Sequence, residues 1–260
     1  MRLITWNVAG RVGKQSDQAA AIAGVNADVV CLQEVTLRTA PLWREALAAA
    51  GFAAVETALD GLPPKPTKRR LAVLTAARAA VTRLPAPDDL PWPERVLCCE
   101  VEGVEIVNVH SPIAPSPELA KIRTHEAVAA HLREPSARPR VLCGDLNTPR
   151  RELEDGTLLT FAHDTHGRLR PERGERWDLA ERALVRDLGW TDAWRALHGY
   201  GTRDASWTFK DDRGGWRLDH VLLDGLEPVA SVYCHEWRRA GLSDHSALLV
   251  DVQPPAATTS

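Results

Sequence analysis

The stretch Val141-Leu142-Cys143-Gly144-Asp145-Leu146-Asn147-Thr148-Pro149 joins a short apolar run to two polar residues. The run is preceded by Pro139 and predicts a buried strand that stops at the glycine and delivers Asp145 and Asn147 into a loop. Because residues two apart in a strand point to the same side, a carboxylate and a carboxamide would converge on one point. The alternative is an Asx turn, in which the two side chains only close the loop.

The composition is that of an ordinary globular protein. The chain has 260 residues, of which 44% are hydrophobic and 26% charged, so it can bury a sizeable core and belongs to neither the disordered nor the fibrous class. We expect one domain over residues 1–252, followed by a disordered tail over residues 253–260. The net charge of −3 gives no bulk basicity, so any binding to DNA must come from local patches.

The sequence predicts a cytoplasmic, monomeric protein without a membrane partner. It opens directly on an apolar strand, with no charged leader, and no later apolar run approaches the length needed to cross a bilayer. The five cysteines are odd in number, lie mostly in apolar contexts and lack the spacing of zinc ligands. We therefore expect buried thiols in a reducing compartment.

The apolar pattern predicts strands and helices along the whole chain. Strands are expected over residues 3–7, 28–35, 106–110, 141–145 and 247–252, and the short runs 52–57, 71–76, 79–84, 95–101 and 104–109 have the composition of an antiparallel meander. Helices are expected around Ala19 and Ile22, from the N-cap candidate Thr39 to Gly51, over residues 116–134 and over about 178–188. Residues 150–176 are expected to form an irregular surface loop.

Polar residues stand at the ends of many of these strands. They are Asn7, Glu34, His110, Asp145, Asn147, Asp219, Asp244 and His245. Any one of them is typical of a turn, but turns alone do not explain so many at successive strand ends. Carboxylates with amides and two histidines, without cysteine, suit a hard cation such as Mg²⁺ or Mn²⁺.

Six short motifs carry a resemblance to a known family. They are Thr5-Trp6-Asn7, Leu32-Gln33-Glu34, Asn108-Val109-His110, Gly144-Asp145-Leu146-Asn147, Arg217-Leu218-Asp219-His220 and Ser243-Asp244-His245. Their order resembles that of the endonuclease/exonuclease/phosphatase superfamily of exonuclease III-like and DNase I-like metal-dependent phosphoesterases. The resemblance covers nearly the whole chain. It implies a four-layer α/β sandwich, with two packed mixed β-sheets flanked by helices, and metal-dependent hydrolysis of a phosphate ester.

The resemblance also implies the metal ligands. Glu34 would be the chief ligand, with Asn7 and Asp244 close by, and Mg²⁺ is the expected ion, with Mn²⁺ as the alternative. Ala9 departs from the pattern, because some abasic-site endonucleases place an aspartate there, near the metal. This departure leaves the geometry of the metal site open.

Catalytic roles follow from the same resemblance. Asp145 and Asn147 would hold the attacking water and a phosphate oxygen, while Asp219 would orient His245. His110 would protonate or stabilise the leaving oxygen. Exonuclease III-like members generally carry a tyrosine at this strand end, whereas other members carry a histidine. Whether Asp145 or the pair of His245 and Asp219 is the general base stays open.

A substrate-binding wall is implied around two tryptophans. Trp207 and the segment Trp216-Arg217-Leu218 are similar to the wall that receives a flipped abasic sugar in abasic-site endonucleases. A flat apolar pocket accepts a deoxyribose without its base and excludes a normal nucleotide. The alternative, two core aromatics, is equally open because the chain has nine tryptophans.

A basic loop provides a second candidate contact with DNA. Lys68, Arg69 and Arg70 end a proline-stiffened stretch, and we expect them either to contact the phosphate backbone or to form a solvated surface.

These observations favour a magnesium-dependent phosphodiesterase acting on DNA, of abasic-site endonuclease or 3′-exonuclease type. His110 and the acidic net charge instead favour a small-molecule or lipid phosphate ester, or a protein–DNA phosphotyrosyl link, as substrate. A non-catalytic binding module is disfavoured by the full set of carboxylates.

Overall fold

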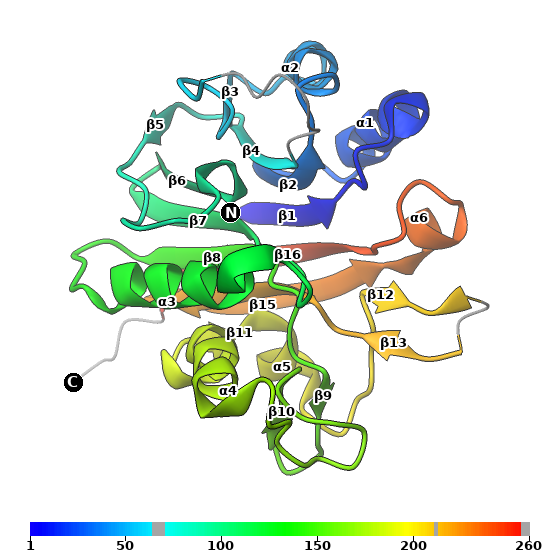
Figure 1. The fold of residues 1–260 in the computed structure, drawn as a ribbon. Helices are drawn as coiled ribbons and strands as arrows, with labels where there is room; N and C mark the ends of the chain where they lie inside the picture. Colours follow the sequence, from blue (N-terminus) through cyan, green and yellow to red (C-terminus); the bar gives the residue numbers. More distant parts are fainter. Residues whose placement is uncertain (64–70, 211–212, 256–260) are drawn as a thin grey trace, which may run out of the picture.

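The computed structural model describes residues 1–63, 71–210 and 213–255. Two six-stranded mixed sheets pack face to face, and helices cover their outer faces (Figure 1). The predicted four-layer α/β sandwich is therefore confirmed. Lys68, Arg69 and Arg70, together with residues 256–260 of the predicted tail, lie outside the described residues. In the part of the chain that is described, a search for helices long and apolar enough to span a membrane found none.

The first sheet is built around the amino-terminal strand. Its order is β15 (Glu227–Cys234), β16 (Ala247–Gln253), β1 (Arg2–Asn7), β2 (Val29–Val35), β4 (Ala72–Ala77) and β3 (Ala54–Thr57). Strands β1 and β2 are parallel and are joined through α1 (Gln15–Gly24), while β16 runs antiparallel to β1. α1 and α2 (Ala40–Ala49) pack on the outer face through side chains such as Ile22, Trp43 and Leu47.

The second sheet contains the stretch that ends at Asp145. Its order is β11 (Thr191–Asp192), β14 (Asp219–Asp224), β8 (Arg140–Asp145), β7 (Val104–His110), β6 (Val96–Val101) and β5 (Val81–Arg83). Strands β7 and β8 are parallel and connected through α3 (Ala120–Arg133). α3 and the π-helical turn Ala183–Asp187 cover the outer face, the latter following α4 (Gly174–Arg182).

Alternation along the strands explains why both faces of each sheet are apolar. Cys31 of β2 and Cys143 of β8 point into the core between the sheets, whereas Leu32 and Leu142 point outward to the helices. A period of two residues together with burial on both faces produces the near-continuous apolar runs seen in the sequence. The five cysteines are buried free thiols, as predicted.

The predicted meander is split between the two sheets. Strands β3 and β4 pair in the first sheet, while β5, β6 and β7 pair in the second. The strands exist where they were predicted, but their partners depend on contacts distant in sequence.

Thr39 precedes α2 as predicted, but its side chain makes no capping hydrogen bond to the helix. Its Oγ1 instead accepts from the backbone N–H of Thr36.

Several smaller elements differ from the expectation. The predicted helix 178–188 starts at Gly174 and closes with the π-helical turn, and the final strand runs one residue further, to Gln253. The loop 150–176 holds a short ribbon of β9 (Arg151–Glu152) and β10 (Leu158–Leu159). Elements β15, α5 (Ala193–His198) and α6 (His235–Arg239) were not predicted, and a second ribbon joins β12 (Trp207–Thr208) to β13 (Gly215–Trp216). Short 3₁₀ turns cover Val12–Lys14, Pro93–Arg95 and Pro117–Leu119.

Candidate active site

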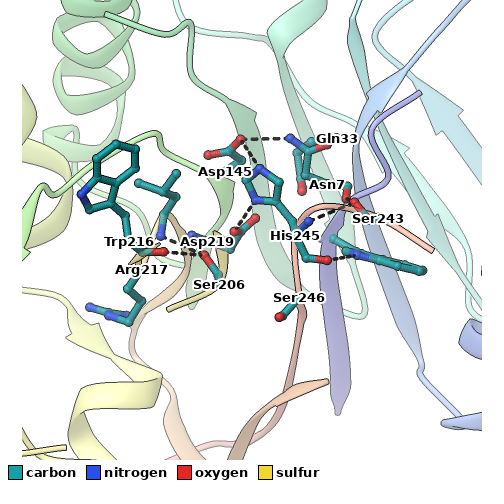
Figure 2. Close-up of polar contacts among 12 residues, drawn as sticks. Asn7, Gln33, Asp145, Ser206, Trp216, Arg217, Asp219, Ser243, His245 and Ser246 are labelled. Atoms are coloured by element: carbon teal, nitrogen blue, oxygen red, sulfur yellow. Dashed lines mark hydrogen bonds and ion pairs between the residues drawn. The ribbon is translucent and has the colours of Figure 1, made fainter. Parts of the chain in front are cut away.

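Strand ends bring most of the predicted site residues together at one end of the two sheets. In strand register, Asp145 lies opposite His110 of β7 on one side and Asp219 of β14 on the other. Asn7 ends β1, and His245 lies two residues before β16 (Figure 2). Residues far apart in sequence therefore converge because parallel and antiparallel neighbours meet at this edge.

Gly144 permits the close approach of β7 and β8 at this edge. Its φ is +128°, and a Cβ atom placed on it would lie 2.0 Å from the carbonyl oxygen of Val109. Backbone cannot yield as a flexible side chain can, so only glycine fits before Asp145.

The two carboxylate oxygens of Asp145 have different partners. Oδ1 accepts from the backbone N–H of Asn147 at 2.9 Å, which is the Asx turn of the alternative interpretation. Oδ2 accepts from Asn7 Nδ2 at 3.0 Å and lies 3.8 Å from Nε2 of both His110 and His245. Asp145 therefore closes an Asx turn through Oδ1 and also faces other polar side chains of the site through Oδ2. Asn147 follows the end of β8 with φ +50°, so it converges on Asp145 through this turn and not through strand alternation.

His245 and Asp219 form a buried pair beside Asp145. Nδ1 of His245 lies 2.7 Å from Oδ2 of Asp219. Burial disfavours the charged imidazole, but the carboxylates of Asp219 and Asp145 outweigh it and raise the pKa of His245 to about 10. Burial, reinforced by Asp219 and opposed by His245, raises the pKa of Asp145 to about 7.

The donor set at this edge fits a hard divalent cation. Within the described residues, ligand atoms of Asp145, Asp219 and His245 lie within 4.8 Å of one another, and Oδ1 of Asp219 is buried without a hydrogen-bond partner. Asn7 Nδ2 also donates to Oε1 of Glu34 at 3.3 Å. Glu34 has a φ of +60° at an irregularity in the pairing of β2 with β4, which is a costly conformation for this residue type. Carboxylate and amide oxygens are the ligands that such cations prefer.

Asp244 lies at the exposed rim of the site. Its side chain is 52% exposed, and its Oδ1 is 3.9 Å from Nη2 of Arg11. The structure thus groups Asn7 and Glu34 with Asp145, and it leaves Asp244 outside this buried group.

Sequence reasoning missed Arg95, which faces His110. Its Nη1 lies 2.7 Å from Nδ1 of His110, and its guanidinium packs on the ring of Trp92. Burial, together with the charge of Arg95, lowers the pKa of His110 well below its usual range. Arg95 ends a 3₁₀ turn and belongs to no motif, so the sequence carries no local signal for its position.

Two serines to which the sequence analysis gave no role, Ser206 and the motif residue Ser243, hold the backbone around the site. Oγ of Ser206 accepts from the backbone N–H groups of Leu218 and Asp219, and Oγ of Ser243 donates to the carbonyl of Asn7 at 2.6 Å (Figure 2). They fix the start of β14 and the approach to His245. Leu218 itself is buried, with 5% of its surface exposed.

An aromatic wall of four residues adjoins the site. It consists of Trp207, Trp216, Phe209 and Phe161. The tryptophan rings stack at 5.1 Å with an interplanar angle of 11°, and the phenylalanines meet Trp216 edge-on at 4.8 and 5.0 Å. Both tryptophans are half-buried, so they do not belong to the core, and Trp207 pairs through its backbone with His245.

A second group of charged residues includes Arg217, which directly follows Trp216 of the wall in the chain. We call it the arginine group, and it consists of Arg195, Arg217, Glu152 and Asp192. Arg217 Nη2 lies 2.7 Å from Glu152 and 2.6 Å from Asp192, and Arg195 Nη2 lies 2.7 Å from Glu152. Burial would raise the pKa of Glu152, but the two arginines outweigh it and lower the pKa to about 2. Arg217 lies in one of the family motifs, but its guanidinium pairs with Glu152 and Asp192 and not with the residues around Asp145.

Comparisons with solved structures give the same fold. The chain resembles an AP endonuclease from Archaeoglobus fulgidus, with 19% identity over 96% of this chain and 98% of that chain and a TM-score of 0.71. It also resembles the 3′ phosphatase NExo from Neisseria, with 22% identity, coverage of 97% and 99% and a TM-score of 0.68. It also resembles a humanized D. rerio TDP2, with 16% identity over 97% of this chain and 98% of that chain and a TM-score of 0.66.

A comparison with curated proteins finds no match. The model of the Endonuclease/Exonuclease/phosphatase family, in contrast, matches residues 4–245, and this span contains all six motifs and every residue of the buried site. The chain therefore belongs to the endonuclease/exonuclease/phosphatase family of divalent-metal-dependent phosphoester hydrolases.

Proposed function

We propose that the chain is a magnesium-dependent phosphodiesterase that acts on DNA, as an abasic-site endonuclease or a 3′-exonuclease. The observation that carries this proposal is the aromatic wall, whose residue Trp207 pairs directly with the backbone of His245. Because of this pairing, we expect a nucleotide whose sugar contacts the wall to present its phosphate to Asp145 and His245.

The site residues divide the work of hydrolysis among themselves. A divalent cation, held by Glu34 with Asn7 beside it, would offset negative charge on the phosphate oxygens when bound. His245 is held by Asp219 through Nδ1, so its Nε2 faces the reacting phosphate and can donate to a phosphate oxygen. Oδ1 of Asp145 accepts from the backbone of the turn, whereas Oδ2 accepts from the side-chain amides of Asn7 and Asn147, and we assign Oδ2 to the proton of the attacking water.

The wall supports a substrate that lacks a base. Half-buried stacked rings present a flat apolar surface, against which a deoxyribose without its base can pack. Two of the similar structures carry names that agree with this proposal, one an AP endonuclease and the other a 3′ phosphatase bound to a product DNA hairpin.

The test is cleavage of a labelled duplex that contains one abasic-site analogue, beside the intact duplex, with Mg²⁺ or with a chelator. We expect metal-dependent incision at the lesion, or digestion from a 3′ end, and its loss in Asp145→Ala. Trp216→Ala should reduce discrimination for the lesion, whereas Trp190→Ala, at a half-buried tryptophan that packs on Arg140, should not. Equal activity with chelator, or no cleavage of either duplex, would overturn the proposal.

One observation favours a second candidate. His110 stands where some family members carry a tyrosine, and Arg95 contacts it, which suits a phosphate ester with a different leaving group. A protein–DNA phosphotyrosyl link or a small or lipid phosphate ester would then be the substrate. Assays of a 5′-tyrosyl oligonucleotide and of bis(p-nitrophenyl) phosphate separate the candidates, because activity on these alone would move the chain to this branch.

A further inference from the structure

Lys121 of α3 is a lysine buried next to the loop of residues 145–149, which we call the catalytic loop. Only 1% of its surface is exposed, and its Nζ donates to Oε1 of Glu181 at 2.6 Å and to the backbone carbonyl of Asn147 at 2.7 Å. Lysines are almost never fully buried unless they are paired. The ammonium is therefore fixed by one carboxylate and by the residue that follows the Asp145 turn.

Glu181 of α4 extends this contact to both sides of the loop. Its carboxylate accepts from Oγ1 of Thr148 at 2.8 Å, from the backbone N–H of Phe161 at 2.7 Å and from Nε1 of Trp177 at 2.6 Å. Thr148 directly follows Asn147 in the chain. The ion pair therefore contacts two consecutive residues of the catalytic loop, Asn147 and Thr148, and also Phe161 of the aromatic wall.

Asn147 transmits this restraint to Asp145. Its backbone N–H donates to Oδ1 of Asp145, and its Nδ2 donates to Oδ2 of Asp145 at 3.3 Å and to the carbonyl of Ser111 at 2.8 Å. The backbone of Asn147 has φ +50°, a conformation that a free loop leaves readily. A bond to its carbonyl from a buried ammonium opposes that change.

Packing of the two helices does not by itself require a buried ion pair. Ile122 of α3 already meets Trp177 and Ala180 of α4 in an apolar cluster with Ala162. A buried pair of charges is often less favourable than apolar side chains of the same volume. The ion pair also contacts the catalytic loop, which the apolar cluster does not explain.

We propose that the ion pair of Lys121 and Glu181 positions Asn147, and through it Asp145, for phosphoester hydrolysis. This inference rests on the catalytic role that the proposed function gives to Asp145. Lys121 and Glu181 are positioning residues, since they act through the loop. The same pair also restrains the wall, because Nζ of Lys121 lies 4.8 Å from the ring centre of Phe161, which in turn contacts Trp216.

A double-mutant cycle tests the proposal. Lys121→Met and Asn147→Ala are made alone and together, and kcat, KM and Tm are measured on the cleaved duplex and on bis(p-nitrophenyl) phosphate. We expect Lys121→Met to lower kcat about 10- to 100-fold with little change in KM. In the Asn147→Ala background, which keeps the backbone carbonyl and N–H but loses the side-chain bonds to Asp145 and Ser111, the same substitution should lower kcat less than it does in the wild type. A kcat of Lys121→Met within twofold of the wild type would overturn the proposal.

Two further variants guard against misfolding. Lys121→Met/Glu181→Gln avoids an uncompensated buried carboxylate and must show the same loss of kcat if positioning is the cause. Arg123→Met, at an exposed residue of the same helix, should leave kcat and KM unchanged. If DNA is not cleaved but the small ester is, the proposed function fails and the cycle is still measured on the ester.

A spectroscopic measurement needs no turnover at all. In ¹⁵N-labelled protein, Lys121→Met should shift or broaden the backbone and side-chain amide signals of Asn147, whereas Arg123→Met should leave them in place. An unmoved Asn147 signal in folded Lys121→Met would overturn the proposal even if catalysis were lost.

Discussion

Two buried groups of charged residues differ in how their charges are balanced, although they share neighbouring residues of the chain. Arg217 belongs to the arginine group, and Asp219, two residues later, belongs to the catalytic group of Asp145, Asp219 and His245. In the arginine group, guanidinium groups bind both carboxylates at 2.6 to 2.7 Å. In the catalytic group, one oxygen of Asp219 is left without a partner among the described residues.

The pKa values of two carboxylates express this difference. Glu152 and Asp145 are both buried, and burial raises the pKa of each. Two arginines reverse that effect and bring the pKa of Glu152 to about 2. At Asp145 the charge of His245 offsets burial only in part, Asp219 adds to it, and the pKa stays at about 7. Burial alone therefore does not distinguish the two carboxylates, but the extent to which nearby cations balance it does. The following three predictions test this contrast.

The largest effect is expected for Asp145→Asn. It keeps the shape of the side chain but removes the proton acceptor, so kcat should fall at least about 10³-fold, or about 4 kcal/mol of barrier. Because the substitution also removes a poorly balanced buried charge, Tm should not fall. Steady-state kinetics and thermal unfolding of the metal-free protein measure the two effects. Activity within tenfold of the wild type would contradict the catalytic role of Asp145.

Glu152→Gln should do the reverse. It leaves two arginines without their shared carboxylate, so the free energy of unfolding should fall by about 3 kcal/mol, while kcat of the folded fraction should change only a few-fold. Urea unfolding gives the stability. Glu154→Gln is the matched control. The contact of Glu154 with Arg203 is long, at 3.9 Å, and exposed to solvent, so its loss should have almost no effect on stability. Equal stabilities of the two variants would mean that the arginine group does not support the fold.

A smaller effect is expected on acidification. The pKa of Glu152 is lowered from 4.5 to about 2 in the folded protein, so the unfolded chain takes up this proton first as the pH falls. Its stabilisation is complete above about pH 4.5 and is lost toward pH 2, and it amounts to about 3 kcal/mol at most. Unfolding free energies measured between pH 5 and pH 3 should therefore decrease less steeply in Glu152→Gln than in the wild type. Parallel curves would show that other groups dominate acid unfolding.

The sequence predicted the parts of the site that depend on local pattern. Asn7, Glu34 and Asp145 stand at the ends of apolar runs, and a short apolar run indicates both the strand and where it stops. Lys121 and Glu181 lie in helices among other charged residues, where nothing local distinguishes a buried charge from a solvated one. Their environment depends on contacts 60 residues apart in sequence, which only the folded chain provides.

The fold was predictable in part. Most strands followed from apolar runs, and the four layers were implied by the family resemblance, whereas the division of the meander depends on which strands pair. Strand β15 was missed because it lies at a sheet edge, contains Pro228 and exposes Val229 and Val232, so its pattern is not that of a buried strand.

The β12–β13 ribbon forms a small sheet separate from the two large ones. Substitutions of its side chains would change the surface that we propose to meet a substrate, while the registers that place Asp145 and Asp219 belong to β8 and β14. In evolutionary terms, we infer that the side chains of the ribbon can vary while the large sheets stay fixed. Such an arrangement would let one hydrolytic core adopt new substrates through changes in a few ribbon residues.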